Sequence, residues 1–136
     1  MIKKSIKYVD FNGNEREEDF YFHMSVPEVT RLQTKVAPES IEDYILRIAR
    51  EDKLEAVLEL IEEIILGSVG TKSPNGKSFI KNKEFREEFE YSQAYAELFE
   101  ELMTKPDSLQ AFAAGIGALV KPAPSDTAFT VAQNGQ

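Results

Sequence analysis

One long amphipathic segment in the middle of the chain, residues 52–67, places the strongest constraint on the fold. Its apolar residues recur three and four positions apart, which is the spacing of one face of an α-helix. They are Leu54, Val57, Leu58, Ile61, Ile64 and Ile65, with Leu60 and Leu66 widening the face. The opposite side is acidic and carries Glu55, Glu59, Glu62 and Glu63. Because so wide an apolar face must be covered by other elements, this segment predicts the central helix of a hydrophobic core.

The residues at the two ends of this segment predict where the helix begins and ends. Asp52 can accept a hydrogen bond from the first backbone N–H groups, and Glu55, three positions later, completes a capping box. Gly67 or Gly70 can end the helix in the left-handed conformation, which glycine adopts at the least cost. The prediction is therefore a helix that Asp52 caps and one of these glycines ends.

The first 24 residues predict a β-hairpin, because apolar and polar residues alternate on both sides of a turn signal that contains Asn12-Gly13. A two-residue loop at this dipeptide would put Phe20 on the face opposite Ile6. A three-residue loop over 12–14 pairs Ile6 with Phe20. That register also pairs Ile2 with Met24, Lys7 with Asp19 and Asp10 with Arg16. Since a slip of one residue moves every side chain to the other face, the three-residue loop is the prediction.

Helical spacing dominates residues 25–120, so the predicted fold class is α+β and mostly α-helical. A β-hairpin over 2–24 would be followed by about five or six packed helices. Capping residues mark where several helices begin, at Ser25, Ser40, Asn82 and Pro106-Asp107. Ser92 either begins a further helix or marks a bend.

Two stretches lack helical spacing. Residues 70–81 predict the longest irregular connection, with a tight turn at Pro74-Asn75-Gly76. From Lys121 onward the sequence loses its periodicity and most of its charge, which predicts a disordered tail over 121–136. The predicted organisation is a single domain over 1–120 followed by that tail.

The composition excludes several classes of function. The chain has no cysteine, and therefore no disulfide, no thiolate metal site and no cysteine nucleophile. Its net charge of −8 argues against nucleic acid as a partner, because such binding depends on Lys and Arg contacts to phosphates. No apolar run is long enough to cross a bilayer, and the N-terminal residues do not have the pattern of a signal peptide. No membrane partner is therefore expected.

The sequence offers no catalytic, cofactor-binding or metal-binding set of residues. His23 is the only histidine, and it lies in a predicted strand on the face opposite Phe20 and Phe22, which is typical of a surface or hairpin-packing residue. The glutamate runs lack the Glu-x-x-His pairs of di-metal bundles and the spacing of a calcium loop, so they predict solvated faces. The expectation is a protein that is not an enzyme and needs no cofactor.

Three blocks of the sequence resemble the tail assembly chaperones of long-tailed bacteriophages and their prophages. The blocks are IKYVDFNGNEREEDFYF at 6–22, IILGSVGTKSPNGKSFIK at 64–81 and FREEFEYSQAYAELFEEL at 85–102. In that family they are followed by a short acidic turn and a last apolar helix, as at 106–119. The resemblance covers roughly residues 2–119, with its blocks in the expected order.

This resemblance implies a binding function with no catalytic residues. Tail assembly chaperones associate with the long, apolar and largely helical tape measure protein, keep it soluble and help recruit tail tube protein. They are absent from the finished virion, and the implied location is the cytoplasm of the host bacterium. Many are made in two forms, the longer by a programmed ribosomal frameshift, and this chain would be the shorter form.

A chaperone for an apolar helical client needs exposed apolar surface, and aromatic residues gather in the last third of this chain. Core packing is the usual position of such residues. The alternative is an exposed groove that holds a partner helix or a second copy of the chain. The candidate partner-binding residues are Tyr95, Phe99, Phe112, Ile116 and Leu119. They predict part of the surface for the client or for self-association.

A second hypothesis comes from the charge alone. A small acidic protein can act as a regulator or nucleic-acid mimic that occupies a basic partner. Binding of that kind should fall steeply with ionic strength, whereas an apolar contact should not. An enzyme is the third hypothesis, and it would require a pocket with carboxylates of perturbed pKa.

Overall fold

The computed structural model describes residues 1–118, which contain six helices and four strands. Leu119 and the predicted tail over 121–136 lie outside the described residues. In chain order the elements are β1 (Ile2–Val9), β2 (Glu15–Phe22), α1 (Val26–Val36), α2 (Ile41–Arg50), α3 (Leu54–Leu66), β3 (Val69–Lys72), β4 (Phe79–Ile80), α4 (Lys83–Glu90), α5 (Gln93–Thr104) and α6 (Pro106–Ile116). The predicted class, mostly helical α+β with an N-terminal hairpin, is confirmed.

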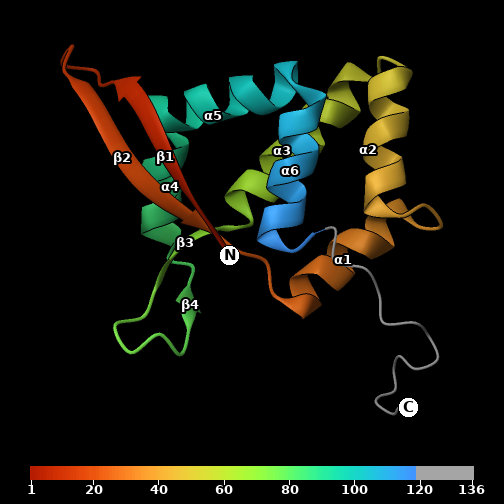
Figure 1. Cartoon of the computed structure of the whole chain (residues 1–136), viewed down its shortest axis with the longest axis horizontal. Coiled ribbons are helices and arrows are strands. Elements are labelled where there is room, and N and C mark those ends of the chain that lie inside the picture. Colours follow the sequence, from red (N-terminus) through yellow and green to blue (C-terminus); the bar gives the residue numbers. More distant parts are fainter. Residues whose placement is uncertain (119–136) are drawn as a thin grey trace.

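The helix α3 lies at the centre of the molecule. Figure 1 shows the β1–β2 hairpin on one side, α2 on the opposite side, and α3 and α6 between them. Both α3 and α6 pack against α2 and α5. The fully buried residues of α3 are Leu60, Ile61, Ile64 and Ile65. The prediction of a central core helix is therefore confirmed.

The predicted caps of α3 are wrong, although the helix, Leu54–Leu66, lies within the predicted segment 52–67. Asp52 does not cap α3, because it lies in the left-handed region (φ +53°) and ends α2. The N–H of Lys53 donates to the carbonyl of Ile48 (2.9 Å), which is the hydrogen-bond pattern of a helix C-terminus. Gly67 follows the last residue of α3 but has right-handed angles (φ −79°), so it does not provide a left-handed stop.

Most of the other predicted caps are confirmed. The exception is Pro106-Asp107: Pro106 is the first residue of α6, but the N-cap is Lys105 and no side chain caps this helix. Ser25 and Glu28 form a reciprocal capping box at the start of α1. Ser40, Asn82 and Ser92 each accept a hydrogen bond from the backbone N–H three residues later. Ser92 therefore begins a separate helix, α5, and this settles the alternative between a new helix and a bend.

The register of the hairpin differs from the prediction by two residues. Ile6 lies opposite Glu18 rather than Phe20, and Ile2 lies opposite Phe22 rather than Met24. Because the difference is an even number of residues, each side chain keeps its predicted face. Ile6 and Phe22 accordingly remain buried against the helices.

Asp10 explains the observed register. Its backbone N–H donates to the carbonyl of Asn14 (2.8 Å), and its carboxylate accepts from the backbone N–H groups of Asn12 and Asn14 (2.9 Å each). The loop therefore contains three residues, as predicted, but spans 11–13 instead of 12–14, with Gly13 at φ +83°. Arg16 also donates to this carboxylate (2.6 Å) and, with the backbone donors, holds the pKa of Asp10 below its usual value.

The stretch predicted as irregular contains two short strands, which the sequence analysis missed. β3 pairs with β2, and β4 pairs with β3, giving an antiparallel sheet in the order β1-β2-β3-β4. The predicted turn is present, because the N–H of Gly76 donates to the carbonyl of Ser73 (2.9 Å). A glycine is needed at position 70, where a Cβ would lie 2.4 Å from the carbonyl oxygen of Ile80.

Burial along α3 predicts which of its residues stabilise the fold. Ile61→Ala removes a side chain with 0% exposure and should lower the free energy of unfolding by about 3 kcal/mol. Leu54→Ala on the same helix, at 60% exposure, should change it by no more than about 0.5 kcal/mol. Urea denaturation of both variants measures the difference, and equal losses would contradict the central position of this face.

Candidate functional site

Two of the five predicted partner-binding residues lie in the hydrophobic core. Phe112 is 4% exposed and its ring meets that of Phe22 edge-on at 5.0 Å. Ile116 is 0% exposed, and its carbonyl accepts a hydrogen bond from the N–H of Met24 (2.8 Å). In this conformation neither has a surface that a partner could contact, because α6 packs its apolar face inward. Leu119 lies outside the described residues.

The other two predicted residues form part of a half-exposed apolar row on α5. Tyr95 and Phe99 are four residues apart, and their ring centroids lie 5.6 Å from each other. Met103, one turn further along, is 38% exposed. We call these three residues the α5 row. Met103 was missed as a candidate, although its spacing of four residues from Phe99 is the signal that places it there.

Helix α3 carries a second apolar row. Leu54 is exposed and Leu58 is half-buried, and the two lie one helical turn apart. The helices α3 and α5 pack together and run in opposite directions across the molecule (Figure 1). Glu62, one turn beyond Leu58, is close enough to Tyr95 to affect its ionisation. From this packing and from the nearness of Glu62 to Tyr95, we infer that Leu58 and Leu54 lie beside the α5 row, and we call these residues the apolar strip between α3 and α5.

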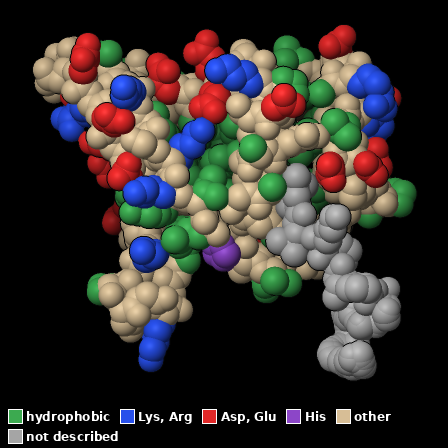
Figure 2. Space-filling view, viewed as in Figure 1, with side chains coloured by type: hydrophobic (Ala, Val, Ile, Leu, Met, Phe, Trp, Pro, Cys, Tyr) green, Lys and Arg blue, Asp and Glu red, His purple; other side chains and the backbone are tan. Residues whose placement is uncertain are grey.

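Exposed glutamates lie on the same helices, including Glu55, Glu59 and Glu62 on α3. In Figure 2 acidic and basic side chains are interspersed with apolar ones over the part of the molecule where the hairpin, α5 and α2 lie. Burial, followed by the charges of Glu62 and Glu90, raises the pKa of Tyr95 to about 12. The Tyr95 hydroxyl is protonated at neutral pH, as any tyrosine with an ordinary pKa would be, and can donate a hydrogen bond to a partner.

The raised pKa of Tyr95 predicts a loss of stability at alkaline pH. Above pH 10 the unfolded chain releases the tyrosine proton, while the folded chain keeps it until about pH 12. The unfolded state then binds fewer protons, so the free energy of unfolding should fall as pH rises through this window. Tyr95→Phe cannot ionise and should fall less steeply. Urea denaturation between pH 8 and pH 11.5 measures both slopes, and equal slopes would contradict the assignment.

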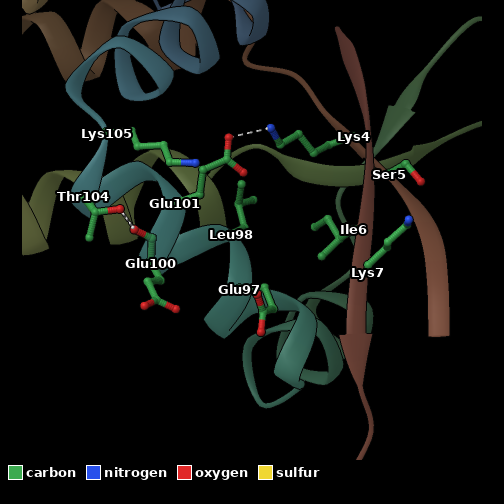
Figure 3. A pocket seen from close by; sticks show the side chains of 10 residues that line it. All are labelled: Lys4, Ser5, Ile6, Lys7, Glu97, Leu98, Glu100, Glu101, Thr104 and Lys105. Atoms are coloured by element: carbon green, nitrogen blue, oxygen red, sulfur yellow. Dashed lines mark hydrogen bonds and ion pairs between the residues drawn. The ribbon is translucent and has the colours of Figure 1, made fainter. Parts of the chain in front are cut away.

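A polar groove lies on the other side of α5, between this helix and β1. Its volume is about 410 Å³, and its walls come from Lys4 to Lys7 on one side and from Glu97 to Lys105 on the other. Figure 3 shows Lys4 and Ile6 directed toward α5, whereas Ser5 and Lys7 point away from it. Lys4 Nζ forms an ion pair with Glu101 Oε2 at 3.0 Å, which ties the strand to the helix.

The single histidine takes part in packing. The His23 ring meets that of Phe79 edge-on at 5.5 Å, and its backbone N–H donates to the carbonyl of Ser68 (2.8 Å). Burial, with smaller effects from the N-terminus and Lys81, lowers the pKa of His23. Its Nδ1 is buried without a hydrogen-bond partner among the described residues. A neutral ring in this position fits the hairpin-packing role predicted from the sequence.

Residues 1–118 contain neither a cluster of metal-ligating side chains nor a helix that could span a membrane. No group of three or more histidine, aspartate or glutamate residues in this range could hold a metal ion. None of the helices described here combines the length and the apolar character needed to cross a bilayer.

Comparison with known protein families shows to which family the chain belongs. A family model described as phage tail assembly chaperone matches residues 1–119. The chain belongs to this family. The resemblance seen in the sequence is thereby confirmed, whereas no curated protein and no solved structure matches the chain. As a tail assembly chaperone it is expected to act by binding other tail proteins, and this indicates a non-enzymatic role.

Proposed function

We propose that this tail assembly chaperone binds the tape measure protein, keeps it soluble and helps recruit tail tube protein in the host bacterial cytoplasm, without remaining in the virion. The binding unit is a single domain over 1–120, and the chain is the shorter of two forms related by a frameshift. The observation that supports the client-binding step best is the apolar strip between α3 and α5.

The strip has the chemistry that an apolar helical client requires. Its contact residues, Leu54, Leu58 and the α5 row, lie on two helices that pack against the core and are therefore held rigidly. An amphipathic helix binds such a surface through apolar side chains spaced three and four residues apart. Exposed glutamates on the same helices, such as Glu55, Glu59 and Glu62, would keep the complex hydrated while the apolar side chains of the client are covered.

The strip reduces the set of partner-binding residues that was predicted from the sequence. Tyr95 and Phe99 can contact a client, whereas Phe112 and Ile116 support α5 from beneath. Self-association through the same strip would compete with the client, because both would cover the same apolar side chains. The free protein should therefore self-associate less when the client is bound.

Substitution within the strip tests the proposal. Met103→Glu places a charge in the α5 row and should weaken binding to the tape measure protein by about tenfold, because the carboxylate would lose water on binding. Tyr91→Glu is the matched control, since Tyr91 is an exposed aromatic residue (74%) outside the strip. The measurement is co-expression with the tape measure protein, followed by affinity capture through this chain.

The salt dependence of capture separates this function from that of an acidic regulator. Capture that persists at high salt and is lost only in Met103→Glu supports an apolar contact. Capture that falls steeply with salt and is equal in the two variants would instead favour the regulator hypothesis.

A further inference from the structure

β1 is an edge strand whose outer backbone groups are unpaired among the described residues. The Asp10–Asn14 pair sets the alternation of hydrogen bonds in the hairpin, so the even-numbered residues of β1 bond to β2. The N–H and C=O groups of the odd-numbered residues, Lys3, Ser5, Lys7 and Val9, therefore point to the free edge. The hydrogen bond from His23 N–H to Ser68 O follows the same alternation on the other side of β2.

The groove between β1 and α5 runs along this strand. A second cavity of about 570 Å³ shares Lys7 and Glu97 with the first, but its lining also includes Glu15, Arg16 and Glu17 of β2, so it lies over the hairpin and does not extend the free edge. The first cavity follows β1 from Lys4 to Lys7, which is about 13 Å of extended chain at 3.3 Å per residue. A groove between an edge strand and a helix is one of the recurring arrangements in which a peptide is bound as an added strand.

We propose that an extended, acidic segment of a partner protein pairs with the free edge of β1 and lies in this groove. Pairing would satisfy the outward backbone groups of Lys3, Ser5 and Lys7. The side chains of Lys3 and Lys7 share the solvent face of the sheet, and neither forms an ion pair with another residue in 1–118. Acidic side chains at alternate positions of the added strand would lie beside them.

The side chains of the added strand that point toward α5 would meet a different environment. Ile6 and Leu98 are buried where β1 and α5 meet, while Glu97 and Glu100 line the outer wall of the groove. Inward positions should therefore be apolar, because carboxylates there would meet glutamates. A second copy of β1 is a poor occupant, since its lysines would lie beside those of the first copy.

Lysines on an edge strand also serve to prevent unwanted pairing, so the test must separate that role from binding. The probe is a synthetic seven-residue peptide in which glutamate alternates with valine. Amide NMR spectra of the full chain should show saturable shifts, and hydrogen exchange should slow at Lys3, Ser5 and Lys7. A lysine–valine peptide of the same length should bind at least tenfold more weakly. No shift at about millimolar glutamate–valine peptide would overturn the proposal.

Two further comparisons test whether the backbone carries the binding. The same peptide with alternate amides N-methylated should bind about tenfold more weakly, and equal binding would overturn strand addition. Ser5→Pro removes one outward N–H and should weaken binding several-fold, while the β1–β2 hydrogen bonds remain. Ser5→Ala is its control, because both variants lose the Ser5 Oγ contact to Glu17 but only the proline loses the N–H.

This site is separate from the apolar strip between α3 and α5. Met103→Glu should leave peptide binding unchanged, and Ser5→Pro should leave capture of the tape measure protein unchanged. Failure of one proposal is therefore distinguishable from failure of the other.

Discussion

The burial of one face of α3 is the interaction on which the rest of the structure depends. Ile61, Ile64 and Ile65 have no exposed surface, and an isolated helix with this face would not be stable in water. Cover comes from α2, from α5 and from the elements packed behind them. β3 begins three residues after α3 ends, so burial of this helix also positions the strand that extends the hairpin into a sheet.

The helix α5 presents three different sides to its surroundings. Leu98 and Leu102 face the core, and they fix the position of the helix. The α5 row borders α3 on a second side, where an apolar contact is available. Glu97, Glu100 and Glu101 lie on the third side, where they line the groove beside β1. One helix therefore separates the surface that we propose for a helical partner from the groove that we propose for an extended one.

The sequence predicted local features reliably where the cause was local. The caps at Ser25, Ser40, Asn82 and Ser92 are confirmed, because each depends only on a side chain and a backbone N–H three residues away. Asp52 was assigned to the wrong helix for a related reason. A residue between two helices can end the first or begin the second, and its backbone angles, which the sequence does not show, decide between them.

Features that depend on distant contacts were less predictable. The strands β3 and β4 are too short to show an alternating pattern, so the sequence predicted a loop there. They are stabilised by pairing, β3 with β2 and β4 with β3. The register of the hairpin followed the hydrogen bonds of the Asp10 carboxylate instead of the strongest apolar pairs. The sequence could not show which of Tyr95 and Phe112 is exposed, because each lies on an apolar helix face.

By itself the sequence determined the fold class, the positions of most helices, the central role of residues 52–67 and the likeness to tail assembly chaperones. These follow from periodicity, capping and motif order, which are properties of short stretches. Only the tertiary structure decided which apolar faces are covered: it buried Phe112 and Ile116, and it left the α5 row and the edge of β1 accessible. The physical reason is that periodicity shows that a face is apolar, whereas exposure depends on what packs against it.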